Sequence, residues 1–154
     1  MVNDAISDTG PILHLTEINL IQAINIFSSV SIPEEVDNEL KKRNIIIPKK
    51  IKVINLKSER KDSVKILTNQ YNLDLGEAEA ISLSLQEKSN YFLTDDLDAR
   101  NIAKFYNLKV HGTIGILLRA FREKIIDKKT AKERILELQT RSSLFITRDL
   151  IKRA

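Results

Sequence analysis

The sequence predicts an α/β domain in which helices cover both faces of a central, mostly parallel sheet. Short apolar runs alternate along the chain with longer segments of helical periodicity, which is typical of consecutive parallel strands joined by helices. The chain has 154 residues, enough for one domain with a substantial core. Because no repeat, linker or low-complexity run interrupts it, we expect residues 1–154 to form a single domain.

The first part of the chain alternates strands and helices that proline residues help to delimit. The expected elements are a strand at 5–7, a helix from about 11 to 26, a strand at 29–32, a helix at 33–43 and an extended segment at 51–56. Pro11 suits the first turn of its helix because a first-turn N–H has no intrahelical partner, and Pro33 starts the next helix. The extended segment is expected at an edge of the sheet or in a connection.

The second part of the chain continues the same alternation. The expected elements are helices at 58–72 and 74–88, a strand at 91–94, a helix at 97–107, a strand at 108–112, and helices at 113–124 and 127–141. The helix at 74–88 has the strongest pattern, since Asp74 is well placed to cap it.

Composition excludes several kinds of chemistry. The chain has no Cys, which rules out disulfides, thiolate catalysis and cysteine zinc sites. His14 and His111 do not have a spacing that suggests zinc, and we interpret His14 as structural because apolar residues surround it in the sequence. The N-terminus does not resemble a signal peptide, and no apolar stretch approaches the ~20 residues that span a bilayer. We therefore expect a cytoplasmic protein that does not enter a membrane.

Carboxylates follow the expected strands or open the helices beside them. Asp8 comes directly after the first strand, and Asp95 and Asp96 follow the strand at 91–94. Glu35 and Glu39 lie early in the helix after the second strand, and Glu77 and Glu79 open the helix that leads to 91–94, so several of these carboxylates are candidates for one site. Ligands of parallel sheets bind beyond the carboxyl ends of the strands, so these side chains are expected to converge.

An acidic cluster without interleaved Lys or Arg suits a hard divalent cation. Mg²⁺ and Mn²⁺ prefer oxygen ligands and take only a few carboxylates each. Such an ion lowers the pKa of a bound water and orients it for attack on phosphorus. The chemistry needs no nucleophilic side chain, which agrees with a chain that lacks Cys.

Four motifs in order along the chain resemble the PIN-domain family. They are "SDTGPILHL" at 7–15, "IPEEVDNEL" at 32–40, "LGEAEAISLS" at 75–84 and "FLTDDLDAR" at 92–100. The sequence is most similar to a bacterial and archaeal branch of PIN-like proteins related to the toxins of type II toxin–antitoxin pairs. The resemblance implies an α/β/α sandwich and a Mg²⁺- or Mn²⁺-dependent endoribonuclease. It also implies a homodimer and a possible antitoxin partner.

Carried over motif by motif, the resemblance implies four acidic positions: Asp8, Glu39, Glu77 and the Asp95–Asp96 pair. We expect Asp8, Asp95 and Asp96 to bind the metal, with Thr94 in a supporting role. Many PIN nucleases have Asp at the third position, so Glu77 departs from the pattern. Which of Asp95 and Asp96 is the main ligand stays open.

Each of these acids also has an ordinary structural interpretation. Asp8 and Asp96 are placed to cap helices, and Asp74 and Glu77 have the spacing of a capping box. Glu39 is placed to pair with Lys42 or Arg43. Glu79 is an alternative to Glu77. Glu35 and Asp98 are best explained as first-turn charges that favour the helix dipole.

Charge is unevenly distributed along the chain. Residues 1–118 have a net charge of −2 and residues 119–154 a net charge of +6. The acidic pocket would repel RNA, so we expect Lys128, Lys129 and Lys132 in this basic helical part, together with Arg100, to bind phosphates. Alternatively, the basic part holds an acidic antitoxin or is a solvated helix face, and Arg100 pairs with Asp96.

Three other functions were considered. A haloacid-dehalogenase-type phosphatase would need an Asp where the chain has Gly10, and a receiver domain would need a different order of elements. The stronger alternative is a non-catalytic PIN-like module that binds nucleic acid or a protein partner.

Overall fold

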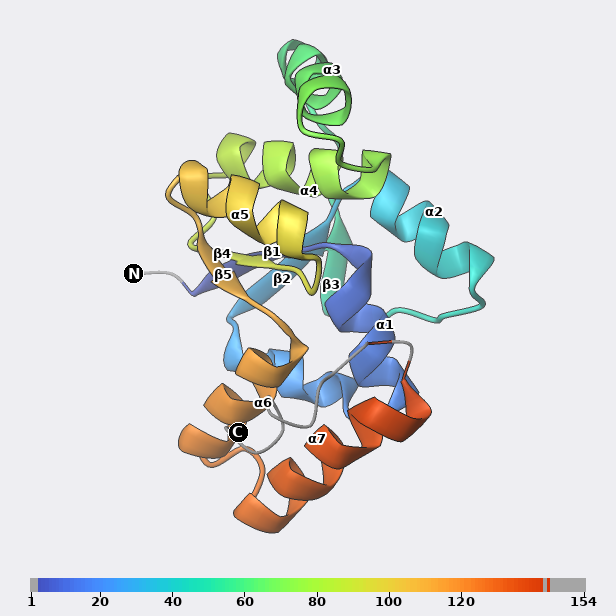
Figure 1. The fold of residues 1–154 in the computed structure, drawn as a ribbon, viewed down its shortest axis with the longest axis vertical. Helices are drawn as coiled ribbons and strands as arrows, with labels where there is room; N and C mark the ends of the chain where they lie inside the picture. Colours follow the sequence, from blue (N-terminus) through green and yellow to red (C-terminus); the bar gives the residue numbers. More distant parts are fainter. Residues whose placement is uncertain (1–2, 143, 145–154) are drawn as a thin grey trace.

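Within the residues that the computed structural model describes, 3–142 and 144, five strands form one sheet (Figure 1). The strands are β1 (Asp4–Ser7), β2 (Ser29–Ile32), β3 (Ile51–Val53), β4 (Tyr91–Leu93) and β5 (Lys109–His111). Their order is β3-β2-β1-β4-β5, and every pairing is parallel. The predicted α/β class is therefore confirmed, and the extended segment at 51–56 contains an edge strand.

Helices connect the strands as the sequence predicts. They are α1 (Thr9–Glu17), α2 (Glu34–Lys42), α3 (Lys61–Gln70), α4 (Leu75–Gln86), α5 (Leu97–Phe105), α6 (Thr113–Arg122) and α7 (Lys128–Arg141), with 3₁₀ turns η1 (Ile21–Ile26) and η2 (Ser58–Arg60). The expected helix to residue 26 was wrong beyond Glu17. Asn19 has a φ of 56°, a left-handed conformation that ends α1 before η1 begins.

The sheet separates two hydrophobic clusters. Alternate residues of β1 point to opposite faces, so Ala5 belongs to one cluster and Ile6 to the other. In Figure 1, α3, α4 and α5 lie above the sheet, whereas η1, α6 and α7 lie below it. The arrangement is the α/β/α sandwich that the sequence predicts.

The periodic apolar face of α6 is part of the lower cluster. Leu117 is completely buried, and Ile114 and Leu118 pack against the same core, while Phe121 is partly exposed. These contacts bury most of the apolar face of α6, so it offers little surface to a second copy of the chain, and the homodimer stays a prediction.

The basic part at 119–154 is helical as far as the structure describes it, in α6 and α7. Three further cations of this basic part, Arg148, Lys152 and Arg153, lie outside the described residues. None of the described helices has the length and apolar character needed to cross a bilayer.

Candidate active site

The carboxyl ends of β1 and β4 open into a cleft of about 470 Å³. All five acids expected from the sequence line it: Asp8, Glu39, Glu77, Asp95 and Asp96. The other described residues that line it are Thr9, Gly10, Leu13, His14, Arg43, Asp74 and Leu144. The parallel sheet therefore brings together carboxylates from four separate segments of the chain.

Asp8 is both the N-cap of α1 and the most buried acid of the cleft. One carboxylate oxygen accepts a hydrogen bond from the Thr9 backbone N–H at 2.7 Å, and the other accepts one from the Thr94 hydroxyl at 3.0 Å. Only 6% of Asp8 is exposed. Burial is the main cause that raises its pKa to about 7; the charges of Asp74 and Glu39 contribute, and the hydrogen bonds from Thr9 and Thr94 act in the opposite direction. The capping and site interpretations of Asp8 are thus compatible.

Glu39 is held in place by a residue adjacent to Asp8. The Thr9 hydroxyl donates a hydrogen bond to Oε2 of Glu39 at 2.5 Å. Burial raises the pKa of Glu39, and the charge of Asp74 adds to the effect. Among the ion pairs of the described residues, none joins Glu39 to Lys42 or Arg43, so the alternative structural interpretation does not explain its position.

Glu77 forms the capping box that the sequence suggests. Its backbone N–H donates to Asp74 Oδ1 at 2.8 Å, and its Oε1 accepts from the Asp74 backbone N–H at 3.0 Å. Burial raises the pKa of Glu77 to about 8, with contributions from the charges of Asp8, Asp74 and Asp96. Capping therefore places this carboxylate among other carboxylates.

Glu79, the alternative to Glu77, faces a different part of the surface. Its Oε1 accepts a hydrogen bond from the Glu35 backbone N–H at 3.1 Å. It lines a second cavity together with Glu34 and Lys61, between α2, α3 and α4. Of the two glutamates, only Glu77 lines the acidic cleft.

Asp95 and Asp96 have different environments. Asp95 Oδ1 accepts from the Thr113 backbone N–H at 2.7 Å, and Oδ2 accepts from the Thr113 hydroxyl at 2.5 Å and lies 2.6 Å from Nδ1 of His14. Asp96 is exposed and caps α5, with Oδ2 accepting from the Ala99 N–H at 2.9 Å. Both oxygens of Asp95 are therefore engaged by protein donors.

Thr94 links the two acidic segments. Its hydroxyl donates to Asp8 and accepts from the Asp96 backbone N–H at 3.1 Å. Since the Thr94 side chain is fully buried, this link fixes the end of β4 relative to the start of α1. These contacts place Thr94 beside two of the acids, and its supporting role in a site stays a prediction.

His14 is a residue of the cleft that sequence reasoning missed. It is nearly buried, and an ionised carboxylate only accepts hydrogen bonds, so Nδ1 of His14 carries the proton that points to Asp95. The spacing in the sequence could have indicated this position. Gly10 and His14 are four residues apart, so they lie on the same face of α1. The interpretation of His14 as structural did not include its contact with Asp95 in the cleft.

The cleft also contains a cation. Arg43, an exposed residue just beyond α2, borders the acids, and its charge lowers the pKa of Glu39 against the effect of burial. The expectation of a pocket without Lys or Arg was therefore wrong. Arg43 is a donor that a phosphate entering the cleft would meet.

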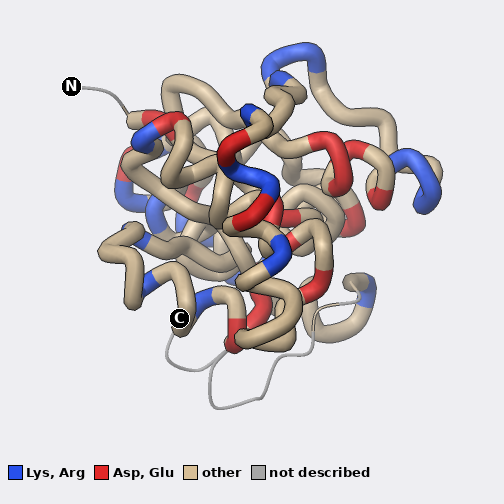
Figure 2. Tube along the Cα trace, turned by 90° about the horizontal axis from the view of Figure 1, so that it is seen from above, with Lys and Arg blue, Asp and Glu red and all other residues tan. Residues whose placement is uncertain are grey.

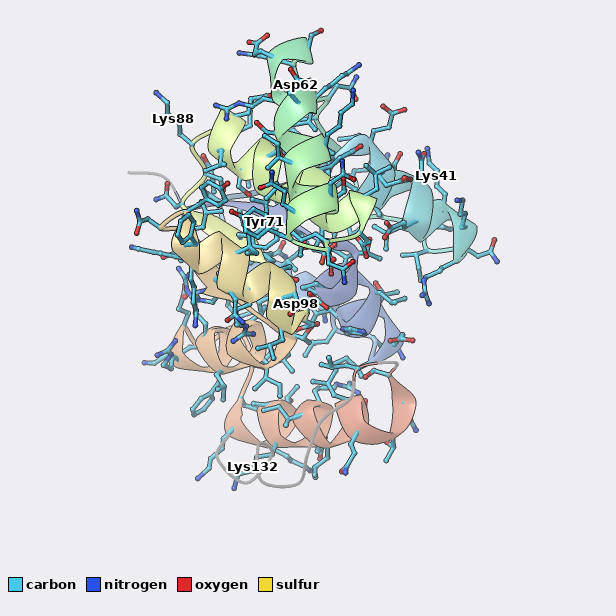
Figure 3. All side chains as sticks on the ribbon, turned by 45° about the horizontal axis from the view of Figure 1, so that its top comes forward. Lys41, Asp62, Tyr71, Lys88, Asp98 and Lys132 are labelled. Carbon is cyan, nitrogen blue, oxygen red and sulfur yellow. The ribbon has the colours of Figure 1, made fainter. Side chains whose placement is uncertain are left out.

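The expected phosphate-binding residues lie outside the cleft lining. Arg100 borders Gly112, where an added Cβ would lie 2.8 Å from Arg100 Nη2 and 2.8 Å from Asp95 Oδ1. In the described part of the chain no ion pair joins Arg100 to Asp96. Lys128, Lys129 and Lys132 are exposed on the first turns of α7, and Figure 3 shows Lys132 on the outer side of that helix. Asp98 is exposed at the start of α5, as a first-turn charge should be (Figure 3).

The donor set fits a hard cation, although the side chains do not form a closed cage. Among the described residues, no group of three or more His, Asp or Glu side chains is arranged to hold a metal ion. Mg²⁺ usually keeps several waters and binds through one or two carboxylates, so it does not need such a group. The pKa values of Asp8 and Glu77 are raised by burial and by repulsion from neighbouring carboxylates. A bound cation would favour the ionised carboxylates and so offset both effects.

Comparison with known proteins identifies the family. A family model described as a PIN domain matches residues 4–154. The chain belongs to the PIN-domain family. PIN domains have a nuclease-type fold, are usually nucleases and generally use divalent metals.

Two further comparisons were informative. The fold is similar to that of a PilT N-terminus domain protein from the archaeon Sulfolobus solfataricus P2, with a TM-score of 0.56 and 16% identity over 76% of this chain and 92% of that one. A sequence comparison with curated proteins gives no significant match. The resemblance seen in the four motifs is thus confirmed at the level of family and fold.

Proposed function

We propose that this PIN domain is a metal-dependent endoribonuclease that hydrolyses phosphodiester bonds of RNA with Mg²⁺ or Mn²⁺. One observation carries the proposal: five acids from four separate segments of the chain, Asp8, Glu39, Glu77, Asp95 and Asp96, line one cleft. Burial raises the pKa values of Asp8 and Glu77, and neighbouring carboxylates add to the effect. Carboxyl groups that share a cleft and have raised pKa values are characteristic of functional sites.

In this proposal, Asp8, Asp96 and Glu77 hold the cation. The ion, when bound, would supply a Lewis acid and an activated water. The protein fixes these carboxylates beforehand: Thr9 and Thr94 orient Asp8, Thr94 orients the backbone of Asp96, and the capping box orients Glu77. Little reorganisation is then needed when the substrate arrives.

The remaining cleft residues take supporting roles. Glu39, held by Thr9, faces the same space and is available to accept a proton from an attacking water. Asp95, expected as a metal ligand, is better suited to anchoring, because His14 and Thr113 already occupy both of its oxygens. Arg43 is available to contact a phosphate oxygen.

The test is cleavage of single-stranded RNA by purified protein with Mg²⁺, with Mn²⁺ and with a chelator. Asp8→Asn and Asp96→Asn should each abolish metal-dependent cleavage. Asp98→Asn is the matched control, since it removes one exposed carboxylate from the same turn of α5 as Asp96. Undiminished cleavage by Asp8→Asn, or equal loss in Asp98→Asn, would contradict the proposal.

A second candidate is a non-catalytic PIN-like module that binds nucleic acid or a partner. It is favoured by the contacts of Asp95, whose two oxygens already lie within hydrogen-bond distance of Thr113 and His14. Isothermal titration with Mn²⁺ separates the two, because an inert module has no reason to bind the ion through Asp8 and Asp96. Binding of RNA without any metal response would support the module.

The toxin role, the homodimer and the cytoplasmic location are further predictions of the same proposal. Co-expression with the product of a neighbouring small reading frame tests the toxin role, since an antitoxin should relieve growth inhibition. Sedimentation at tens of micromolar tests the homodimer, because weak dimers dissociate near micromolar concentrations.

A further inference from the structure

Beside the acidic cleft, one edge of the sheet is rich in positive charge. β5 is the edge strand, and α5 precedes it and α6 follows it. His111, at the end of β5, packs edge to face on Tyr91 with ring centroids 5.1 Å apart, and the Arg119 guanidinium lies 4.9 Å from the centroid of the same Tyr91 ring. Arg100 Nη2 borders Gly112, the next residue after His111. Burial lowers the pKa of His111, and the charges of Arg119, Arg122 and Arg100 contribute. Figure 2 shows several Lys and Arg positions gathered on the side of the molecule that carries this edge (left in the view).

The cations of this edge are available to a ligand. The α5–β5 surface is defined here as Arg100, Lys104, Lys109, Arg122 and Phe105. Within the described residues, none of its four cations is in an ion pair. Lys104, Lys109 and Arg122 are also exposed, and Lys109 Nζ lies 5.8 Å from the centroid of the Tyr91 ring. By contrast, the basic helix α7 neutralises part of its charge internally through Lys129–Glu133 and Arg134–Glu137.

The exposed face of α5 adds apolar groups to these charges. Ala99 and Ala103, one turn apart, are buried against the sheet. On the opposite side, Leu97 is 68% exposed and Phe105 is 75% exposed. The Phe105 ring lies edge to face with Tyr106, with ring centroids 5.6 Å apart. An exposed ring beside cations is the combination on which single-stranded nucleic acid stacks its bases.

The α5–β5 surface is continuous with the cleft. α5 starts at Asp96 in the cleft, and Phe105 lies at its other end, about 13 Å away at the rise of an α-helix. Arg100, one turn from Asp96, borders the loop at Gly112 that also contacts Asp95. A strand that leaves the cleft along α5 would therefore meet Arg100, then Lys104, then Phe105.

We propose that single-stranded RNA occupies the α5–β5 surface, with its phosphates on Arg100, Lys104, Lys109 and Arg122 and a base stacked on Phe105. This inference rests on the proposed ribonuclease function. It assigns the RNA path to α5 and β5, whereas the sequence alone favoured Lys128, Lys129 and Lys132 of α7 together with Arg100.

Salt dependence of binding tests the phosphate contacts. Binding of a labelled oligouridine is measured by fluorescence anisotropy in chelator, which prevents cleavage, across a salt series. The variant Lys104→Ala/Lys109→Ala/Arg122→Ala should reduce the slope of log affinity against log salt by roughly 2, since each lost single-strand phosphate contact reduces it by roughly 0.7. The variant Lys128→Ala/Lys129→Ala/Lys132→Ala removes the same charge from α7 and should leave the slope unchanged.

Phe105 is tested separately. Phe105→Ala should weaken oligouridine affinity by roughly 5- to 150-fold, the range that corresponds to loss of one base–aromatic stack, and Phe105→Trp should restore it. Phe105 is exposed, so its replacement should leave thermal unfolding unchanged. The proposal is overturned if the α7 variant, and not the α5–β5 variant, shows the reduced slope of log affinity against log salt. It is also overturned if Phe105→Ala binds oligouridine with wild-type affinity.

A short substrate separates this inference from the proposed function. A dinucleotide has a single phosphate, which would occupy the cleft and leave none for the α5–β5 surface. All of these variants should therefore cleave the dinucleotide at the wild-type rate. Loss of dinucleotide cleavage would show that the substitutions act on the cleft, and this would contradict the inference. Absence of cleavage in the wild type would contradict only the proposed function.

An acidic protein partner is the competing occupant. If the α5–β5 variant retained full RNA affinity but failed to bind an acidic polypeptide such as polyglutamate, the surface would be a protein interface and the inference would fall.

Discussion

A Cβ atom on Gly76 would lie 2.5 Å from Oε1 of Glu39. Helices α2 and α4 therefore place the Glu39 carboxylate over the first turn of α4 only because residue 76 has no side chain. The glycine in "LGEAEA" makes room for an acid that is far from it in the sequence.

Gly76→Ala should displace Glu39 without unfolding the protein. The clash is with the end of a flexible side chain, and Ala is favoured over Gly within a helix by about 1 kcal/mol, so the melting temperature should hold or rise. Displacement breaks the hydrogen bond from Thr9, and RNA cleavage should fall on the order of a hundredfold, as misplacement by about 1 Å can cost. Activity and thermal unfolding are measured on the same preparation.

Gly10→Ala is the matched control for this substitution. A Cβ there would meet Asp95 Cβ and His14 Cε1 at 3.5 Å, which is ordinary van der Waals contact. Equal loss of RNA cleavage in Gly76→Ala and Gly10→Ala would show that displacement of Glu39 does not explain the loss.

Asp95→Asn and Asp96→Asn should affect different properties. Asp95→Asn replaces a carboxylate that accepts from His14 and Thr113, so the free energy of unfolding should fall by about 1–3 kcal/mol. Asn caps a helix as well as Asp, so Asp96→Asn should keep its stability and lose cleavage. Urea denaturation and RNA cleavage measure the two effects. If instead Asp95→Asn lost cleavage and Asp96→Asn lost stability, Asp95 would be the residue that binds the metal.

Metal-free protein should lose stability as the pH rises. The folded-state pKa values of Asp8 and Glu77 are about 7 and about 8, above ordinary values of 3.8 and 4.5. The folded state therefore holds protons that the unfolded chain has released, and stability declines from about pH 4 until both groups are ionised above about pH 8. The slope for Asp8 alone is at most about 1.4 kcal/mol per pH unit.

Asp8→Asn provides the control for this pH dependence. The variant cannot ionise at residue 8, so it should be more stable than wild type near about pH 8 and similar to it near about pH 4. Chemical denaturation in chelator at several pH values measures this. A wild-type stability that increases with pH over the same window would contradict the burial of Asp8.

Mn²⁺ or Mg²⁺ should raise the melting temperature. An ion that binds only the folded state at about 100 times its Kd adds about 2.7 kcal/mol of stability. Asp8→Asn and Asp96→Asn should weaken this response, and the double variant should abolish it. Because the ligands must lose protons first, the response should be larger near about pH 8 than near about pH 6. A full response in the double variant would place the ion elsewhere.

The sequence by itself determined most of the fold. Alternating apolar segments indicated the strands and helices, and the Asp74–Glu77 capping box was readable because its two residues are close in the chain. The order of carboxylates along the chain predicted that several of them converge, and the resemblance to PIN domains singled out Asp8, Glu39, Glu77, Asp95 and Asp96. All five line the cleft. There are two physical reasons. Capping hydrogen bonds join residues that are close in the sequence, and all strands of a parallel sheet end at the same edge.

The tertiary structure alone decided which atoms meet. His14 contacts Asp95 across 81 positions of sequence, and Thr9 contacts Glu39 across 30. Such contacts depend on the rotation of each helix about its axis and on its distance from the sheet. The apolar pattern of the sequence determines that rotation only approximately. The same rotation directs Glu77 into the cleft and Glu79 to a second cavity, although the two residues are neighbours on α4.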